Sequence, residues 1–183
     1  MKLKNPFQFL YGLFMGTTVE LFKGQRPIWP LNFEKIKEGF YIASGGARNC
    51  GIFIQQSHID LIDTNLDEAA TKLKSFLQQN WPQLQVRNIF LTDNSPEASS
   101  GVALYKNALL NSHTDSEYHM ESIDDVFETP VHTVAVHDYL FTGFLFYNRV
   151  HPDFHRITVK NIEGWVAELE ELAMVEKKFV PCE

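Results

Sequence analysis

Apolar positions recur along the chain with two different spacings. Helical spacing is found over Asp67–Gln79, where Ala69, Ala70, Leu73, Phe76 and Leu77 share one face. It returns over Ile162–Met174, with the expected buried side formed by Trp165, Val166, Leu169, Leu172 and Ala173. A further helix is predicted over Val102–Leu110. The pattern therefore predicts three helices in the body of the chain.

Short β-rich runs lie between these helices, separated by turn residues. Two of the runs, Gly51–Gln55 and His58–Asp63, are predicted to form a hairpin that turns at Gln56–Ser57. The other expected strands are Phe40–Ser44, Val86–Leu91, Val131–Val136, Tyr139–Tyr147 and a last one from Phe179, with 131–136 and 139–147 paired around His137–Asp138. Polar loops are expected over Thr92–Ser100 and Asn111–Asp125. This alternation is typical of one α/β domain.

The N-terminal segment has a different character. The run Phe7–Met15 is apolar, and Leu21 and Phe22 extend its helical face, so residues 1–30 are predicted to form an apolar helix and a turn-rich linker before a domain over 31–183. The run is too short to span a membrane. We expect it to bind a protein partner, to pack on the domain, or to self-associate through residues 7–22 as a homodimer. A membrane-surface anchor is the alternative, although such anchors usually carry a basic polar face, which this run lacks.

Composition narrows the classes of partner and compartment. The 183 residues carry a formal charge of -7 and no basic run, which argues against nucleic-acid binding. The two cysteines, Cys50 and Cys182, match neither a disulfide scaffold nor a CxxC metal site. They are interpreted as reduced thiols of a cytoplasmic protein, with a single bridge between them left open.

Two segments at predicted strand ends carry candidate chemistry. Asp60–Asn65 ends a strand in an acidic turn, and Thr92–Gly101 is a polar loop between a strand and a helix. Ligands of open α/β sheets usually bind at such positions.

At these segments the sequence resembles the metallo-β-lactamase superfamily. The matching pieces, in order, are Gly45–Ile52, Leu61–Thr64, Leu140–Gly143, Gly164-Trp165 and Phe179–Pro181. They are most similar to small bacterial members described as quinoprotein-relay or sulfur-oxidation-type hydrolases. The resemblance implies a trimmed αββα sandwich, in which the turn at Asp63 lies beside the metal loop and organises it by hydrogen bonds to backbone N–H groups.

The metal motif of this superfamily, Thr-His-x-His-x-Asp-His-x-x-Gly, survives here only at its flanks, Thr92 and Gly101. The residues at the four ligand positions between them bind a metal weakly or not at all. The Gly-Asp pair, whose carboxylate bridges the metals in the family, is replaced by Gly143-Phe144. A catalytic zinc needs at least three protein ligands. The sequence therefore predicts no bound metal, no other cofactor and no catalytic residue. The residues at the four motif positions are Asp93, Ser95, Glu97 and Ala98.

A remnant cleft is still expected from Asp63, Asp93, Glu97 and His132. Thr129–Thr133 resembles the family's Thr-Pro-Gly-His-Thr, which would make His132 a remnant of the third metal ligand. In the alternative interpretation, His132 is a strand residue that points outward. The prediction is a non-catalytic protein that acts in binding or recognition. Two alternatives remain: an enzyme with a rebuilt single-metal or metal-free site in this cleft, and a small-molecule binding module with a Phe-rich pocket.

Overall fold

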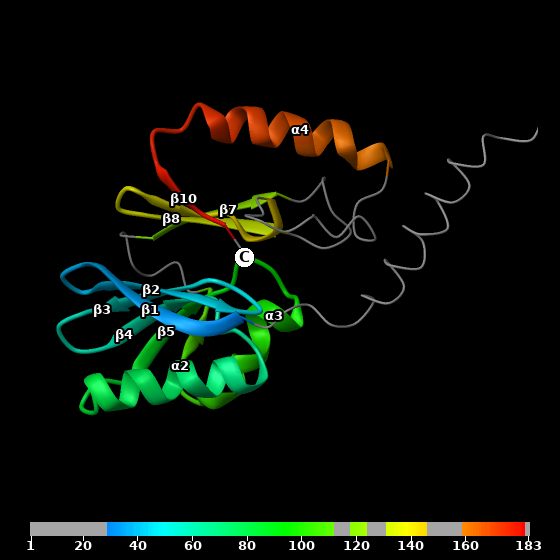
Figure 1. Ribbon diagram of the computed structural model, residues 1–183. Helices are drawn as coiled ribbons and strands as arrows, with labels where there is room; N and C mark the ends of the chain where they lie inside the picture. Colours follow the sequence, from blue (N-terminus) through cyan, green and yellow to red (C-terminus); the bar gives the residue numbers. More distant parts are fainter. Residues whose placement is uncertain (1–28, 112–117, 124–130, 146–158, 182–183) are drawn as a thin grey trace, which may run out of the picture.

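The polypeptide folds into four layers (Figure 1). The structure is a computed structural model that describes residues 29–111, 118–123, 131–145 and 159–181. Helix α2 (Asp67–Asn80) covers the outer face of a six-stranded sheet, and helix α4 (Val159–Ala173) covers the outer face of a four-stranded sheet. The two sheets face each other, so the predicted αββα sandwich is confirmed.

The first sheet has its strands in chain order. Its first four strands are antiparallel, and β4 then pairs in parallel with β5 and β5 with β6. The hairpin predicted around Gln56–Ser57 is confirmed, since the N–H of Gln55 donates to the carbonyl of His58 at 2.9 Å. The strands are β1 (Trp29–Lys37), β2 (Phe40–Gly46), β3 (Cys50–Ile54), β4 (Ile59–Ile62), β5 (Val86–Phe90) and β6 (Leu109–Leu110).

The second sheet has the order β10-β9-β8-β7. Strand β9 is antiparallel to β8 and parallel to β10, so the C-terminal strand closes one edge. The predicted pairing around His137–Asp138 is correct, but β9 ends at Phe141 and a short 3₁₀ turn, Gly143–Leu145, follows it. The strands are β7 (Tyr118–Ile123), β8 (Val131–Val136), β9 (Tyr139–Phe141) and β10 (Lys178–Val180).

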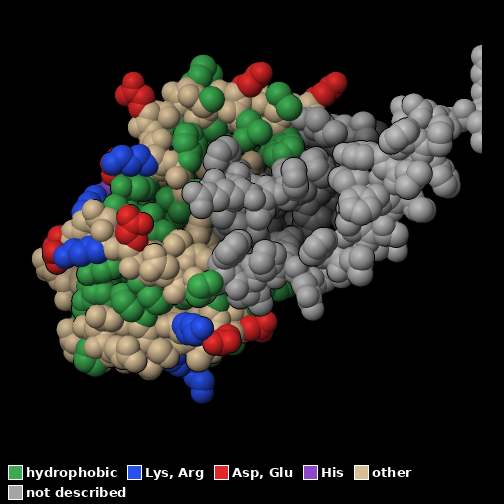
Figure 2. Space-filling model, in the orientation of Figure 1, with side chains coloured by type: hydrophobic (Ala, Val, Ile, Leu, Met, Phe, Trp, Pro, Cys, Tyr) green, Lys and Arg blue, Asp and Glu red, His purple; other side chains and the backbone are tan. Residues whose placement is uncertain are grey.

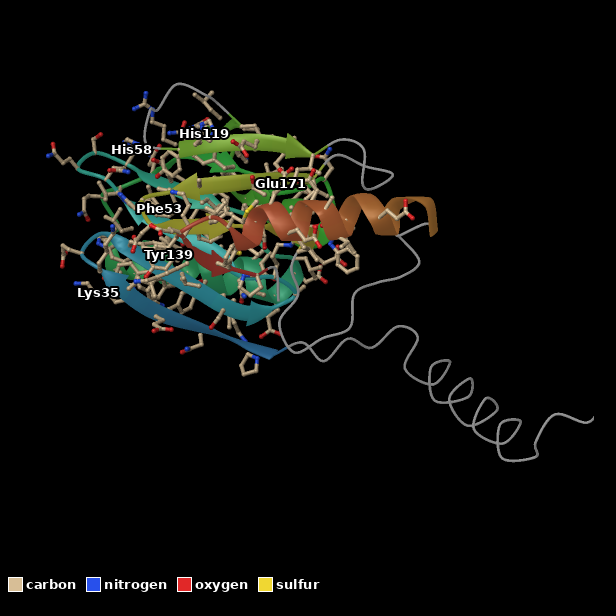
Figure 3. The ribbon with its side chains drawn as sticks, turned by 90° about the horizontal axis from the view of Figure 1, so that it is seen from above. Lys35, Phe53, His58, His119, Tyr139 and Glu171 are labelled. Carbon is tan, nitrogen blue, oxygen red and sulfur yellow. The ribbon has the colours of Figure 1, made fainter. Side chains whose placement is uncertain are left out.

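Aromatic rings fill the space between the sheets. Phe40 and Phe53 stack with ring centroids 4.5 Å apart, and Tyr139 meets Phe40 edge-on at 4.9 Å. Phe53 and Tyr139 are labelled in Figure 3. Phe90 and Phe141 belong to the same core. Such offset and edge contacts add to the free energy gained from burying the rings.

A second core lies between the first sheet and α2. The helix buries Ala69, Ala70, Leu73 and Leu77 at helical spacing, as predicted. Asp67 and Glu68 in its first turn are favourable beside the positive end of the helix dipole. Every second side chain of the strands points toward α2 and packs against these helix residues. Ile52 and Leu61 are examples, and both are fully buried. This core fixes the sheet whose strand ends carry the candidate site.

The helix predicted over Ile162–Met174 is present as α4, but only part of its predicted buried side is buried. Trp165, Leu169 and Leu172 are partly buried, and the indole N–H of Trp165 donates to the carbonyl of Leu145 at 3.0 Å. Val166 is 47% exposed and Ala173 is exposed, so these two assignments are wrong. The reason is angular: positions 165, 169 and 172 lie close together on a helix, while 166 and 173 are rotated toward solvent.

The helix predicted over Val102–Leu110 does not form. A 3₁₀ helix, η1 (Ser100–Leu104), is followed by a turn at Tyr105 and by the edge strand β6. Strand β6 pairs with the edge of β5, with Leu109 opposite Asn88 and Leu110 opposite Ile89. The backbone hydrogen bonds of this pairing outweigh the local helix propensity. The preceding loop also contains a short helix, α3 (Pro96–Ser99), where only a loop was predicted.

Besides β6, two strands were missed by the sequence pattern. Strand β7 lies inside the predicted loop 111–125, because acidic and polar residues on its exposed side hide the alternation of buried Tyr118 and half-buried Met120. Strand β1 begins at Trp29, inside the predicted linker, and pairs with β2 as an edge strand. Proline at position 30 is tolerated there because an edge strand needs fewer ladder hydrogen bonds.

The predicted apolar helix at residues 7–22 lies outside the described residues, so its packing or association stays a prediction. Within the parts of the chain that are described, no helix is both long and apolar enough to cross a membrane. On the face shown in Figure 2, Lys and Arg side chains are interspersed with Asp and Glu.

Candidate functional site

The candidate site lies at the carboxyl ends of β4 and β5. Asp63 follows β4 and Thr92 comes two residues after β5. The backbone N–H of Thr92 donates to Asp63 Oδ1 at 2.8 Å, and the Thr92 hydroxyl donates to Asp63 Oδ2 at 2.7 Å. Asp63 therefore organises the following loop through a backbone N–H, as the family resemblance implied.

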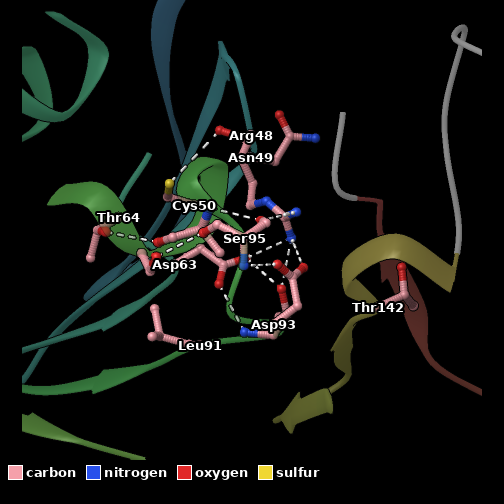
Figure 4. A network of polar contacts seen from close by, with 12 residues as sticks. Arg48, Asn49, Cys50, Asp63, Thr64, Leu91, Asp93, Ser95 and Thr142 are labelled. Carbon is pink, nitrogen blue, oxygen red and sulfur yellow. Dashed lines mark hydrogen bonds and ion pairs between the residues drawn. The ribbon is translucent and has the colours of Figure 1, made fainter. Parts of the chain in front are cut away.

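A guanidinium group fills the centre of this site (Figure 4). Arg48 is 1% exposed, and its Nη1 lies 2.7 Å from Asp93 Oδ2 and 3.4 Å from Asp63 Oδ2. The same nitrogen donates to the Thr92 hydroxyl at 2.9 Å, and Nη2 donates to Ser95 Oγ at 3.3 Å. A buried arginine is stable only when carboxylates and other acceptors surround it, which is the arrangement here.

The loop after Thr92 is shaped by two of the residues that stand at motif positions. Asp93 accepts the backbone N–H of Ser95 on Oδ1 at 2.7 Å, leaving Oδ2 for Arg48. Ser95 is the N-cap of α3, and its hydroxyl accepts the N–H of Ala98 at 3.3 Å. Both side chains thus have structural partners within the protein.

The loop that carries Arg48 is held in place by Asn65. This residue is fully buried, and its side-chain amide donates to the carbonyl of Gly45 at 3.2 Å and to that of Arg48. Its Oδ1 accepts the N–H of Ala47 at 2.9 Å. The backbone entering Arg48 is therefore fixed by one side chain from the turn after β4.

That turn has an unusual backbone. Asp63, Asn65 and Asp67 adopt φ values of 57°, 62° and 49°, in the left-handed region that favours glycine. Asp and Asn tolerate this conformation better than other residues with a Cβ atom. Gly101 allows η1 to approach the turn, because a Cβ there would lie 2.5 Å from the carbonyl oxygen of Thr64. The left-handed residues and the close approach of η1 together define the path of the turn beside the site.

The electrostatics of the site follow from one cation facing two carboxyl groups. Burial raises the pKa of Asp63, the charge of Arg48 opposes that rise, and the negative charge of Asp93 adds to it. Asp93 has the closer contact with Arg48. The pKa of Asp63 is therefore set by the balance of burial and the Asp93 charge against the charge of Arg48.

This balance predicts a pH effect on stability. Because the folded chain holds the Asp63 proton more tightly, its contribution to stability is fully present below the unfolded pKa of about 3.9 and is lost as pH rises through the folded pKa. In Asp63→Asn that loss cannot occur. We expect the free energy of unfolding of the wild type to fall relative to Asp63→Asn as pH rises above about 4. Urea unfolding of both chains at matched pH values measures this, and a wild type that gains on the variant would contradict it.

The other predicted cleft residues are placed less centrally. Glu97 is half-buried on α3. His132 is half-buried on β8, and its backbone N–H donates to the carbonyl of Thr92 at 2.6 Å, which joins the two sheets at this edge. Gly143 lies against Thr92, so the start of the Gly143-Phe144 pair is beside the site. The C-terminal segment also reaches it, since the Asn49 amide donates to the Pro181 carbonyl at 3.0 Å.

Cys50 does not belong to the reactive part of the site. It is a free, fully buried thiol in the core beneath α2, and burial raises its pKa well above the ordinary value. A buried protonated thiol is a poor nucleophile. Cys182 lies outside the described residues.

The residues present do not fit a catalytic metal. Both oxygens of Asp63 and of Asp93 already have protein partners, and the positive charge that a metal would supply comes from Arg48. Among the described residues there is no group of three or more His, Cys, Asp or Glu side chains that could hold a metal ion. Because a metal and a guanidinium would compete for the same oxygens, we derive no reaction step through a metal.

A second polar cluster lies near the opposite end of β4. The carboxylate of Asp60 is fully buried and accepts hydrogen bonds from the Asn88 amide at 2.8 Å and the Tyr118 hydroxyl at 3.0 Å. His58 Nε2 lies 3.3 Å from the same carboxylate. Since Tyr118 belongs to the second sheet, this cluster joins the sheets and explains how a carboxylate is accommodated in the core.

The fold has many solved counterparts. The metallo-β-lactamase FIM-1 from Pseudomonas aeruginosa, in its mono-zinc form, aligns with 84% of this chain and 88% of its own at a TM-score of 0.62 and 14% identity. A metallo-β-lactamase from Pontibacter korlensis aligns over 84% and 91% with a TM-score of 0.64 and 15% identity, and one from Hirschia baltica over 84% and 90% with 0.59 and 12%. No protein-family model matches the sequence, and no curated protein is significantly similar to it.

Layer order, sheet topology and these similarities define the class: the chain has the metallo-β-lactamase fold. At 12–15% identity the likeness concerns the fold alone, so function has to be argued from the site.

Proposed function

We propose that this chain is a non-catalytic protein of the metallo-β-lactamase fold that acts by binding. The observation that carries the proposal is the buried ion pair between Arg48 and Asp93 in the loop that resembles the metal motif. A protein-derived cation takes the electrostatic role of the metal and keeps the loop folded. The scaffold then persists without the Lewis acid and activated water on which metal-dependent hydrolysis depends.

The hydrogen-bond pattern supports this proposal over a rebuilt enzyme site. A general base or nucleophile needs a reactive group that faces the substrate. Here Asp63 and Asp93 are 2% and 1% exposed and point at Arg48. The Ser95 hydroxyl is engaged as an N-cap and as an acceptor for Arg48. The polar groups at the strand ends are thus committed to structure.

Hydrolysis assays test the proposal. We expect no turnover of a chromogenic β-lactam, an aryl ester, a thioester or a phosphodiester above the rate without protein, with or without added zinc. The matched control is Asp93→Asn, which removes the carboxylate that lies 2.7 Å from Arg48 Nη1 and should give the same blank rate. Saturable turnover by the wild type that Asp93→Asn abolishes would contradict the proposal and favour the rebuilt site.

A further inference from the structure

A cavity of about 330 Å³ opens between α2, the start of β4 and β5, and the segment after η1. It lies at the amino ends of β4 and β5, whereas the Arg48 site lies at their carboxyl ends. Its apolar lining comes from Ile59, Leu77, Leu84, Val86 and Leu104. The volume is at the lower end of the range for small-molecule sites, roughly 300–1,000 Å³. No Phe lines it, so the predicted Phe-rich pocket is not this cavity.

The charged groups around the cavity have one sign. Lys74 and Lys106 line it and no Asp or Glu does, although the whole chain carries 23 acidic and 16 basic residues. Lys74 Nζ donates to the carbonyl of Leu104 at 3.1 Å. An ammonium group has three N–H donors, so this contact leaves two for a ligand. Lys106 is exposed at the rim.

We propose that this cavity binds a small amphiphilic carboxylate. A short acyl chain packs against the apolar lining, and the carboxylate pairs with the ammonium groups of Lys74 and Lys106. Apolar burial supplies the affinity, and the two lysines select a negative head group over a neutral or positive one. This site is separate from the cleft around Arg48, so failure of one proposal leaves the other unaffected.

Calorimetric titration of the full chain with octanoate tests the proposal. We expect saturable binding of one octanoate, weaker binding of octanol and no binding of octylammonium, since all three share one tail. Lys106→Gln should weaken octanoate binding about 2- to 5-fold, the range of a single partly exposed ion pair. Lys74→Gln should act in the same direction, and the double variant should weaken binding by roughly tenfold.

Lys72→Gln is the matched control. Lys72 lies on the same helix, is exposed, pairs with Glu68 at 2.9 Å and does not line the cavity. Octanoate affinity should be unchanged in this variant. Lys106 is exposed, and a melting curve of Lys106→Gln equal to that of the wild type separates lost binding from lost folding. Absence of saturable binding, equal binding of octanol, or an equal loss in Lys72→Gln would each overturn the proposal.

Discussion

Replacing Arg48 with Met should lower the free energy of unfolding by about 3–5 kcal/mol, because it leaves Asp93 as a buried charge without its counter-ion. The side chain of Met fills much of the same space, so the loss comes from the charge rather than from a cavity. Urea unfolding at neutral pH measures the effect. The change also removes the other contacts of the guanidinium, since Arg48 reaches Asp63, Thr92, Asp93 and Ser95 at once.

A second substitution separates charge from packing in this experiment. Adding Asp93→Asn to Arg48→Met removes the stranded carboxylate, and we expect it to restore a large part of the lost stability. Arg87→Met is the matched control, because Arg87 is exposed on β5 and its replacement should change stability by less than about 0.5 kcal/mol. Equal stability of Arg48→Met and Arg87→Met would show that the guanidinium does not hold the loop.

Replacing Asn65 with Ala should lower the free energy of unfolding by about 2–4 kcal/mol. The change removes the Asn65 amide from the carbonyls of Gly45 and Arg48 and from the N–H of Ala47. Of these contacts only the one to Arg48 is fully buried, and a buried group left without a partner costs about 1–3 kcal/mol. The change also places an alanine at a φ of 62°, which adds roughly 1 kcal/mol of strain. Thermal and urea unfolding measure the total.

Two variants resolve these contributions. Asn65→Gly loses the same hydrogen bonds without the strain, so it should be less destabilised than Asn65→Ala. Asn80→Ala is the matched control, because Asn80 is exposed at the end of α2 and contacts only the Phe76 carbonyl, at 2.8 Å, among the described residues. If Asn65→Ala unfolds like Asn80→Ala, the turn after β4 does not position Arg48.

Much of the fold was predictable because its elements bury one face with a regular period. Helix α2, the hairpin of β3 and β4, and strand β8 were found from apolar spacing alone. Elements stabilised by distant partners were not. Strand β6 has two residues and depends on pairing with β5, and β7 shows its alternation only once the second sheet defines an inside.

The candidate site was predictable only in part, for a related reason. Asp63 and Asp93 stand out as acidic residues after two neighbouring strands, so their convergence could be expected from topology. Arg48 was not assigned a role, because it lies between small residues in a loop far along the chain from Asp93. The available signal was chemical: two acidic residues converging in a buried site need a cation, and Arg48 is the basic residue within the matched entry segment Gly45–Ile52.

Metal content shows whether Arg48 or a metal ion neutralises the carboxylates of the cleft. The purified full chain is equilibrated with excess zinc or iron at neutral pH, passed through a desalting column and analysed for metal and protein by elemental analysis. If Arg48 supplies the positive charge of the cleft, the chain should retain far less than one metal ion per molecule. Retention of about one ion per chain, lost in Asp93→Asn, would contradict the account, since a ligated metal and the buried guanidinium cannot share the same carboxylate oxygens.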